Sequence, residues 1–357
     1  MTHLEKKART ALAGSAALVI CLGVALAAPA QADKPPSNSS TGTGSVFEVN
    51  PVQSTGNQSL TDQKDAAGAV PASAYATVRL RNLDGSGRLV GKWVNVRSST
   101  GAEAYSATNT FGYTRADDRF EQVMAYFWVN QAQEYIRSLG FGTTLRPVNA
   151  ESQDVRINQY GVDNSFSWDK HDYLRFGKGG VDDAEDGEVI VHEYGHAVHD
   201  AQVPGFGTSL DAGSIGEAFG DYLAVVVGLD AAQQNGWPVL APEPCVADRD
   251  SVSYTSTAPH CLRRLDSGLV LEDREDEVHF DGMIWSHALW DIRQRYVALG
   301  FTTQDWDRTL IDSQFDYAPD ASFDDAARAT YLKALANEGP DAAAAVQDAF
   351  ADRHIDF

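Results

Sequence analysis

Two short motifs in this 357-residue chain carry side chains that could hold one metal ion. The first is His192-Glu193-Tyr194-Gly195-His196, and the second contains Glu217. Residues four apart on a helix share one face, so His192 and His196 can ligate the same ion. A carboxylate from a second helix, Glu217, would complete a His, His, Glu set and leave the fourth position of a Zn²⁺ ion for water. We therefore expect one zinc ion per chain.

The neighbouring residues have the types that hydrolysis of a peptide bond needs. Zinc lowers the pKa of a bound water to roughly 7. Glu193 can reach that water without being a ligand, and can take its proton during attack on a carbonyl. Asp221, four residues after Glu217, can accept the free ring N–H of a ligating histidine. His279 is our candidate for stabilising the oxyanion.

Apolar patterns predict the helices that must position these residues. Residues 186–200 predict a largely buried helix with its polar face towards a cleft, and residues 215–227 predict a second helix against it. Residues 117–139 and the segment from 281 onward also have helical patterns. Alternation over residues 75–96, around Asp84-Gly85-Ser86-Gly87, predicts a β-hairpin.

With these motifs the chain resembles gluzincin zinc metallopeptidases of the thermolysin/fungalysin group, and it is closer to fungalysin-type bacterial members. The resemblance runs from about Asp117 to the C-terminus. It implies an α+β, thermolysin-like zincin fold. In that fold a mixed β-sheet N-terminal part and a mainly helical C-terminal part flank the active-site helix. The resemblance rests on 192–196, Gly216-Glu217 with Asp221, 278–282, 124–127 and 163–166.

The resemblance also implies roles for individual residues. His192, His196 and Glu217 would be the zinc ligands, Glu193 the general base and His279 the transition-state donor. In the family an asparagine of a cleft-edge strand binds substrate backbone, and Asn164 matches it.

Several positions stay open. The arginine that contacts the substrate carbonyl could be Arg263 or Arg264, although a surface salt bridge fits them equally well. The carboxylate that orients His279 could be Asp273 or Asp276. No tyrosine lies between His196 and Glu217, where thermolysin has an oxyanion donor. The oxyanion would then rest on zinc and His279, or on a tyrosine from elsewhere, such as Tyr194 or Tyr222.

Composition predicts export and a domain organisation. Residues 1–32 combine early basic residues, an apolar run over 11–28 and Ala30-Gln31-Ala32, which is typical of a cleaved secretory signal rather than a membrane anchor. We expect a flexible tail over 33–75, a β-rich segment over 76–116, and a catalytic domain over 117–357 with subdomains of about 117–200 and 201–357. Whether 33–116 is a propeptide or part of the catalytic unit stays open.

The excess of acidic residues limits the kinds of molecule that the protein can bind. The chain has a formal net charge of −22, and residues 1–32 hold only one of its 50 acidic residues. This charge argues against nucleic acid or anionic membrane as partner. No stretch after residue 32 is expected to span a bilayer. We expect a soluble, secreted monomer that acts on peptides or proteins.

Cysteines and acidic runs give two further expectations. Cys245 and Cys261, the pair left after signal cleavage, predict a disulfide. The acidic runs over 182–188 and 272–277 could bind Ca²⁺, although acidic first turns that complement helix dipoles explain them more simply.

Two other functions compete with an endopeptidase. A catalytically silent zinc-binding adhesion module could keep the same fold. An exopeptidase gluzincin would need a motif that anchors the substrate amine, usually Gly-x-Met-Glu-Asn, and this chain lacks it. We therefore favour an endopeptidase.

Overall fold

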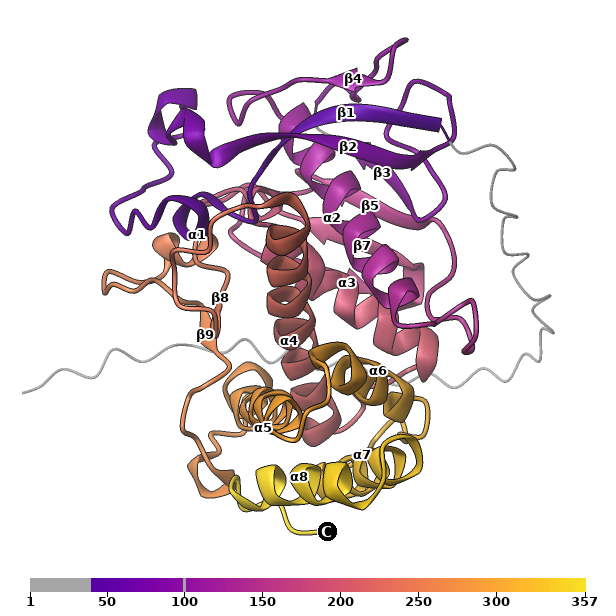
Figure 1. The fold of residues 1–357 in the computed structure, drawn as a ribbon. Coiled ribbons are helices and arrows are strands. Elements are labelled where there is room, and N and C mark those ends of the chain that lie inside the picture. Colours follow the sequence, from indigo (N-terminus) through magenta and orange to yellow (C-terminus); the bar gives the residue numbers. More distant parts are fainter. Residues whose placement is uncertain (1–39, 99–100) are drawn as a thin grey trace, which may run out of the picture. The chain divides into compact units, whose positions relative to one another are not determined.

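The computed structural model describes residues 40–98 and 101–357 (Figure 1). The predicted signal peptide, residues 1–32, lies outside the described residues. The main helices are α1 (Pro51–Thr55), α2 (Arg119–Ser138), α3 (Gly187–Gln202), α4 (Leu210–Asn235), α5 (Val278–Ala298), α6 (Thr303–Gln314), α7 (Phe323–Asn337) and α8 (Pro340–Ala351).

Two sheets lie in the N-terminal half. In the first, β1 (Ser40–Phe47) pairs antiparallel with β2 (Tyr75–Leu83) and parallel with β4 (Thr110–Phe111). The second has the order β3-β5-β7-β6, with bounds Val94–Ser98, Gln153–Ile157, Tyr173–Phe176 and Ser165–Trp168. Helix α2 contacts strands of both sheets and also α3. The predicted α+β arrangement, with sheets first and helices after, is confirmed.

The predicted β-hairpin over 75–96 is wrong. Strand β2 pairs with β1, and β3 pairs with β5, so the two expected arms belong to different sheets. Across the glycine-rich turn the chain forms an isolated bridge between Leu83 and Gly91, with backbone hydrogen bonds from Asp84 to Val90 and from Lys92 to Asn82. The local pattern identified the strands, but their partners come from segments before residue 48 and after residue 152.

The predicted flexible tail over 33–75 is wrong from Ser40 onward. Val46 and Phe47 are fully buried, and the Phe47 ring lies 4.7 Å from the rings of both Tyr75 and Phe120. Asn50 caps α1 by accepting a hydrogen bond from the Gln53 N–H. Strand β1 needs few large apolar residues to be ordered, because pairing with β2 satisfies its backbone N–H and C=O groups.

Helices α3 and α4 connect the sheets to the helical half, as Figure 1 shows. The Asp186 side chain caps α3, and the Ser209 side chain caps α4. Among the described residues, α4 alone is long and apolar enough to cross a membrane, contrary to our expectation that no such stretch would occur. Since 83% of its apolar window is buried inside the protein, α4 has the features of a core helix.

Candidate active site

Glycines allow α3 and α4 to cross closely enough to bring two motifs together. A Cβ on Gly220 would lie 2.7 Å from Nδ1 of His192, and a Cβ on Gly195 would lie 2.9 Å from the Gly220 Cα. Any larger residue at Gly220 would therefore displace His192. Neither glycine was recognised as important in the sequence, although both lie inside the two motifs.

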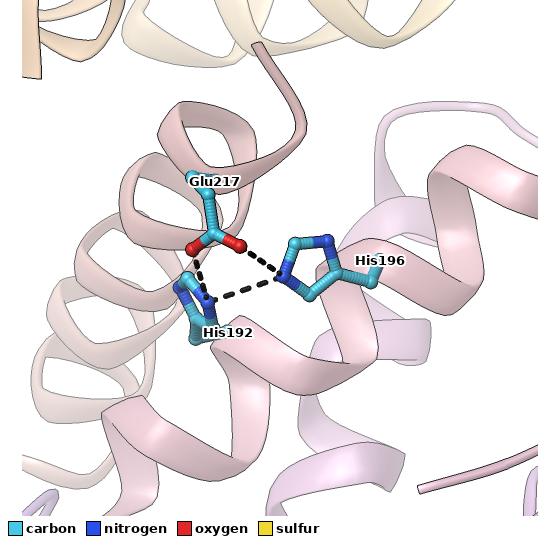
Figure 2. Close-up of side chains that lie close together, drawn as sticks. All are labelled: His192, His196 and Glu217. Carbon is cyan, nitrogen blue, oxygen red and sulfur yellow. Dashed lines mark hydrogen bonds and ion pairs between the residues drawn. The ribbon is translucent and has the colours of Figure 1, made fainter. Parts of the chain in front are cut away.

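This crossing brings His192, His196 and Glu217 together (Figure 2). The two Nε2 atoms lie 3.2 Å apart, and the Glu217 carboxylate lies 3.3 Å from His192 and 3.5 Å from His196. One ligand atom from each residue lies within 4.8 Å of the others. Two imidazoles and a carboxylate are a donor set that suits Zn²⁺. Oε2 of Glu217 is buried and lies 3.3 Å from Nε2 of His192 and 3.4 Å from Nε2 of His279. The nitrogen and oxygen donors thus surround one point, and the residues fit a metal ion.

Two charged side chains, Asp221 and Arg263, hold the ring of His192 in place. Asp221 lies 2.8 Å from Nδ1 of His192, and Arg263 binds Asp221 through two hydrogen bonds of 2.6 and 2.7 Å. Burial alone would lower the pKa of His192, but hydrogen bonds to Asp221 and Glu217 outweigh it and raise the pKa to about 10. A metal ion that binds Nε2 would therefore displace a proton.

The carboxylates of Asp221 and Glu217 remain ionised. Burial would raise the pKa of Asp221, but Arg263 and His192 together lower it to about 2. Burial likewise disfavours ionisation of Glu217, yet His196 and His192 hold its pKa well below the usual range. The site thus keeps two negative charges beside the imidazoles, which favours a divalent cation.

A cavity of about 90 Å³ opens beside these residues. His192, Glu193 and His279 line it together with Asn164 and Arg263. Oε1 of Glu193 accepts a hydrogen bond of 2.8 Å from the Ser165 hydroxyl, and its Oε2 is buried without a partner. The sequence reasoning missed Ser165, although its position beside Asn164 at the start of β6 was a usable signal.

His279 lies at the N-terminus of α5, with its side chain half exposed. Its Nε2 is 3.4 Å from Glu217, and its Nδ1 is 2.6 Å from Glu277. The prediction that Asp273 or Asp276 orients His279 is wrong. Asp273 accepts a hydrogen bond from the Val270 N–H, and neither aspartate contacts His279. Glu277 takes this position because it is the N-cap of α5 and reaches forward to the first turn.

The structure separates the two arginine candidates. The short antiparallel pair β8 (Cys245–Val246) and β9 (Arg263–Arg264) directs successive side chains to opposite faces. Arg263 thus lines the cavity, whereas Arg264 pairs with Asp266 away from it.

The structure also distinguishes the tyrosines considered as oxyanion donors. Tyr194 and Tyr222 are fully buried and donate to Gln133 and Asp307, so neither reaches the cavity. Tyr254 does line it, and its hydroxyl donates to the backbone carbonyl of Asp163. Nothing in the sequence around Tyr254 marked it, because its loop is placed by tertiary contacts alone.

The expected disulfide between Cys245 and Cys261 is present and closes the loop that carries Tyr254. His199 lies in the last turn of α3 and is buried, with its ring stacked 3.8 Å from that of Phe206.

The two acidic runs have different surroundings. In the run over 272–277, Glu272 and Glu277 pair with histidines at the surface. In the run over 182–188, Glu185 is buried against Arg115, and Asp183 lies close to carboxylates from two other segments.

Comparison with known proteins points to one family. Residues 159–318, which include α3, α4 and His279, match the model of the fungalysin metallopeptidase family (M36). Among solved structures, the fold is similar to that of the precursor of protealysin, a metalloproteinase from Serratia proteamaculans. That match has a TM-score of 0.53 and 17% identity, and covers 73% of this chain and 86% of that chain. No curated protein sequence matches this chain significantly.

Proposed function

We propose that this chain, a zinc metallopeptidase of the thermolysin/fungalysin group, is a secreted endopeptidase with Glu193 as its general base. The main support is the convergence of His192, His196 and Glu217 on one point, with His192 and Glu193 both lining the adjacent cavity. When bound there, zinc would make water nucleophilic near neutral pH and polarise the scissile carbonyl.

The residues of the chain would supply the proton transfers. Glu193, oriented by the Ser165 hydroxyl, takes a proton from the attacking water and passes it to the leaving amine. His279, held by Glu277, donates to the oxyanion that develops on the carbonyl. Asp221 fixes the ring of His192, so that Nε2 stays directed at the metal position.

Other cavity residues would bind the substrate backbone. Arg263 is already held by two hydrogen bonds to Asp221. Its remaining N–H groups can donate to a substrate carbonyl with little loss of side-chain entropy. Asn164 lines the same cavity and precedes the edge strand β6. Tyr254 lies in the cavity wall, and its hydroxyl donates to the Asp163 carbonyl. We assign it to the oxyanion position that no tyrosine between His196 and Glu217 can fill, a role in which its single O–H must turn from that carbonyl to the substrate.

The test of this mechanism is Glu193→Gln in zinc-loaded protein. Without the base, kcat for an internally quenched peptide should fall by about 10²–10⁴-fold, while zinc content stays at one per chain. Glu272→Gln, which removes an exposed carboxyl that pairs with His354 and does not line the cavity, serves as the control and should keep full activity. A zinc-loaded wild-type protein that cleaves no peptide would instead indicate a silent zinc-binding module.

A peptide blocked at both ends separates endopeptidase from exopeptidase activity. An endopeptidase should cleave it at an internal bond as fast as the unblocked peptide. An aminopeptidase should cleave only the peptide with a free amine. Mass spectrometry of the products identifies the bond that is cut.

Secretion is supported by the predicted signal over 1–32 and by the disulfide between Cys245 and Cys261. N-terminal sequencing of protein from the culture medium should give Asp33 as the first residue. Protein that stays inside the cell with Met1 intact would contradict export.

A further inference from the structure

Three aspartates from separate segments come together beside the cavity that His192 and Glu193 line. They are Asp163, Asp183 and Asp250. One carboxylate oxygen of each lies within 4.8 Å of the others. Asp163 lies just before β6, Asp183 begins a short helix, η4 (Asp183–Glu185), and Asp250 begins another, η5 (Asp250–Ser253), inside the disulfide loop.

Two of these three carboxylates are buried. Asp183 is 2% exposed and Asp250 is 4% exposed. Within residues 40–98 and 101–357, no lysine or arginine forms an ion pair with any of the three. Two guanidinium groups act on Asp250 electrostatically, but Arg263 is bound to Asp221 and Arg249 pairs with Glu185 instead. Carboxylates this close repel one another strongly when they are buried without a counter-charge.

Unused oxygen atoms in the cluster provide a second, separate indication. Oδ1 of Asp250 is buried and has no hydrogen-bond partner, and the same holds for Oδ1 of Asp163. Buried polar atoms without a partner are rare and call for an explanation. Asp183 and Asp250 both line the 90 Å³ cavity, which has room for an ion and several waters, since one water needs only about 10–15 Å³.

The geometry suits calcium. Ca²⁺ binds oxygen atoms at about 2.3–2.6 Å, so its ligand atoms lie no more than roughly 5 Å apart. Gly180 permits a close approach of Asp163: a Cβ at this position would lie 2.1 Å from Oδ2 of Asp163, so the carboxylate packs directly against the glycine backbone. Three carboxylates with waters would fill such a coordination sphere.

A second buried acidic set nearby is less suitable. Asp186 accepts hydrogen bonds from the backbone N–H groups of Glu188, Arg249 and Asp250, and Glu188 accepts one from Ala247. The oxygens of Asp186 and Glu188 are thus largely satisfied by the protein, whereas both carboxylate oxygens of the neighbouring Asp248 are buried without a partner. Together with Asp248 they do not form a group whose ligand atoms all lie within 4.8 Å among the residues described.

We propose that Asp163, Asp183 and Asp250 form a Ca²⁺ site that ties the edge strand β6, the segment before α3 and the disulfide loop to one another. Asn164 and Ser165 directly follow Asp163, and Tyr254 donates to the Asp163 carbonyl. The ion would therefore fix the position of residues that contact the substrate and of the hydroxyl that orients Glu193. This site is independent of whether the chain cleaves peptides.

The experiment uses zinc-loaded full-length Glu193→Gln protein, which avoids self-cleavage and keeps the zinc site filled. Tb³⁺, a luminescent substitute for Ca²⁺, should bind and be excited by energy transfer from Tyr254. Added Ca²⁺ should displace it with a Kd of about 10⁻⁴–10⁻³ M, the range of extracellular calcium modules. Ca²⁺ should also raise Tm by several degrees, because it binds the folded state only.

Asp250→Asn keeps the shape of the side chain and removes one charge. It should weaken Tb³⁺ and Ca²⁺ binding at least tenfold and abolish the rise in Tm. Asp163→Asn, at a partly exposed position, should do the same and guards against a folding defect in the first variant. Asp248→Asn in the neighbouring acidic set and Asp341→Asn on the exposed surface of α8 are the controls, and both should bind like the parent.

Two results would overturn the assignment. Binding that survives both Asp250→Asn and Asp163→Asn, or that is lost only in Asp248→Asn, would place the ion elsewhere. Alternatively, Asp250→Asn in the active protein could leave Tb³⁺ binding intact and reduce only the cleavage of peptides with lysine or arginine. The acidic wall would then serve a substrate side chain and not a metal ion.

Discussion

At the residue scale, the site depends on carboxylates that act through other side chains. Asp221 holds His192 and Arg263 at once, so one residue positions a metal ligand and a candidate substrate contact. Glu277 has a similar role, since it caps α5 and also holds Nδ1 of His279. These supporting residues decide how accurately the reacting groups are placed.

Glu277→Gln tests whether the carboxylate orients His279. The amide keeps a helix-capping oxygen but loses the charge that stabilises a protonated ring, so kcat should fall about tenfold or more with little change in KM. Steady-state kinetics on the quenched peptide measure both constants. Asp276→Asn, one residue earlier, should leave both unchanged, and equal losses in the two variants would count against the assignment.

His199 should make the protein sensitive to acid. Its burial, reinforced by the nearby His196, lowers its pKa from 6.5 to about 3. Below pH 6.5 the unfolded chain gains a proton that the folded chain refuses, so stability is lost as pH falls from 6.5 towards 3. This residue alone should lower the free energy of unfolding by roughly 1.5–2 kcal/mol between pH 6.5 and pH 5.

His199→Phe removes this titration, and both ring nitrogens of His199 lack hydrogen-bond partners, so no polar contact is lost. Urea unfolding of the metal-free proteins at the two pH values measures the difference. The variant should lose less stability than the wild type over this interval. Equal losses would show that His199 takes up a proton in the folded state.

At the element scale, the crossing of α3 and α4 controls the metal site. Gly220→Ala would place a methyl group 2.7 Å from Nδ1 of His192, and either the ring or α4 must then move. We expect zinc affinity to fall at least tenfold, as measured by competition with a chromophoric chelator. Gly216→Ala adds the same methyl group to the same helix, where the nearest atom is 3.7 Å away, and should bind zinc normally.

At the scale of the whole molecule, the N-terminal segment belongs to the folded protein. Besides the buried Phe47, Asn50 and Gln53 contact Asp186 and Glu188 at the start of α3. A chain that begins at Asp117 should therefore fail to fold, whereas one that begins at Asp33 should fold. Circular dichroism and the yield of soluble, zinc-binding protein measure this. An active mature enzyme that begins near Asp117 would show instead that residues 33–116 are a removable propeptide.

The sequence alone determined the local parts of this protein. The spacing of His192 and His196 fixes a shared helical face, and the apolar patterns predicted α2, α3 and the core of α4, because helical periodicity is a short-range property. Glu217 and His279 were candidates from their residue types and helical context, and the family resemblance implied the same roles. Only the packing of the helices brings them to His192 and His196, since spacing alone does not join separate helices. The buried strand β1 was missed because its residues are mostly small and polar.

Only the tertiary structure decided which of several similar residues face the cavity. Arg263 faces it and Arg264 does not, because pairing of β8 with β9 sets the register of side chains. Glu277, Ser165 and Tyr254 reach the site through contacts between segments far apart in sequence. The aspartates at 163, 183 and 250 likewise become a cluster only when three segments meet. Such contacts between distant segments depend on the packing of the whole chain, and no local sequence pattern predicts them.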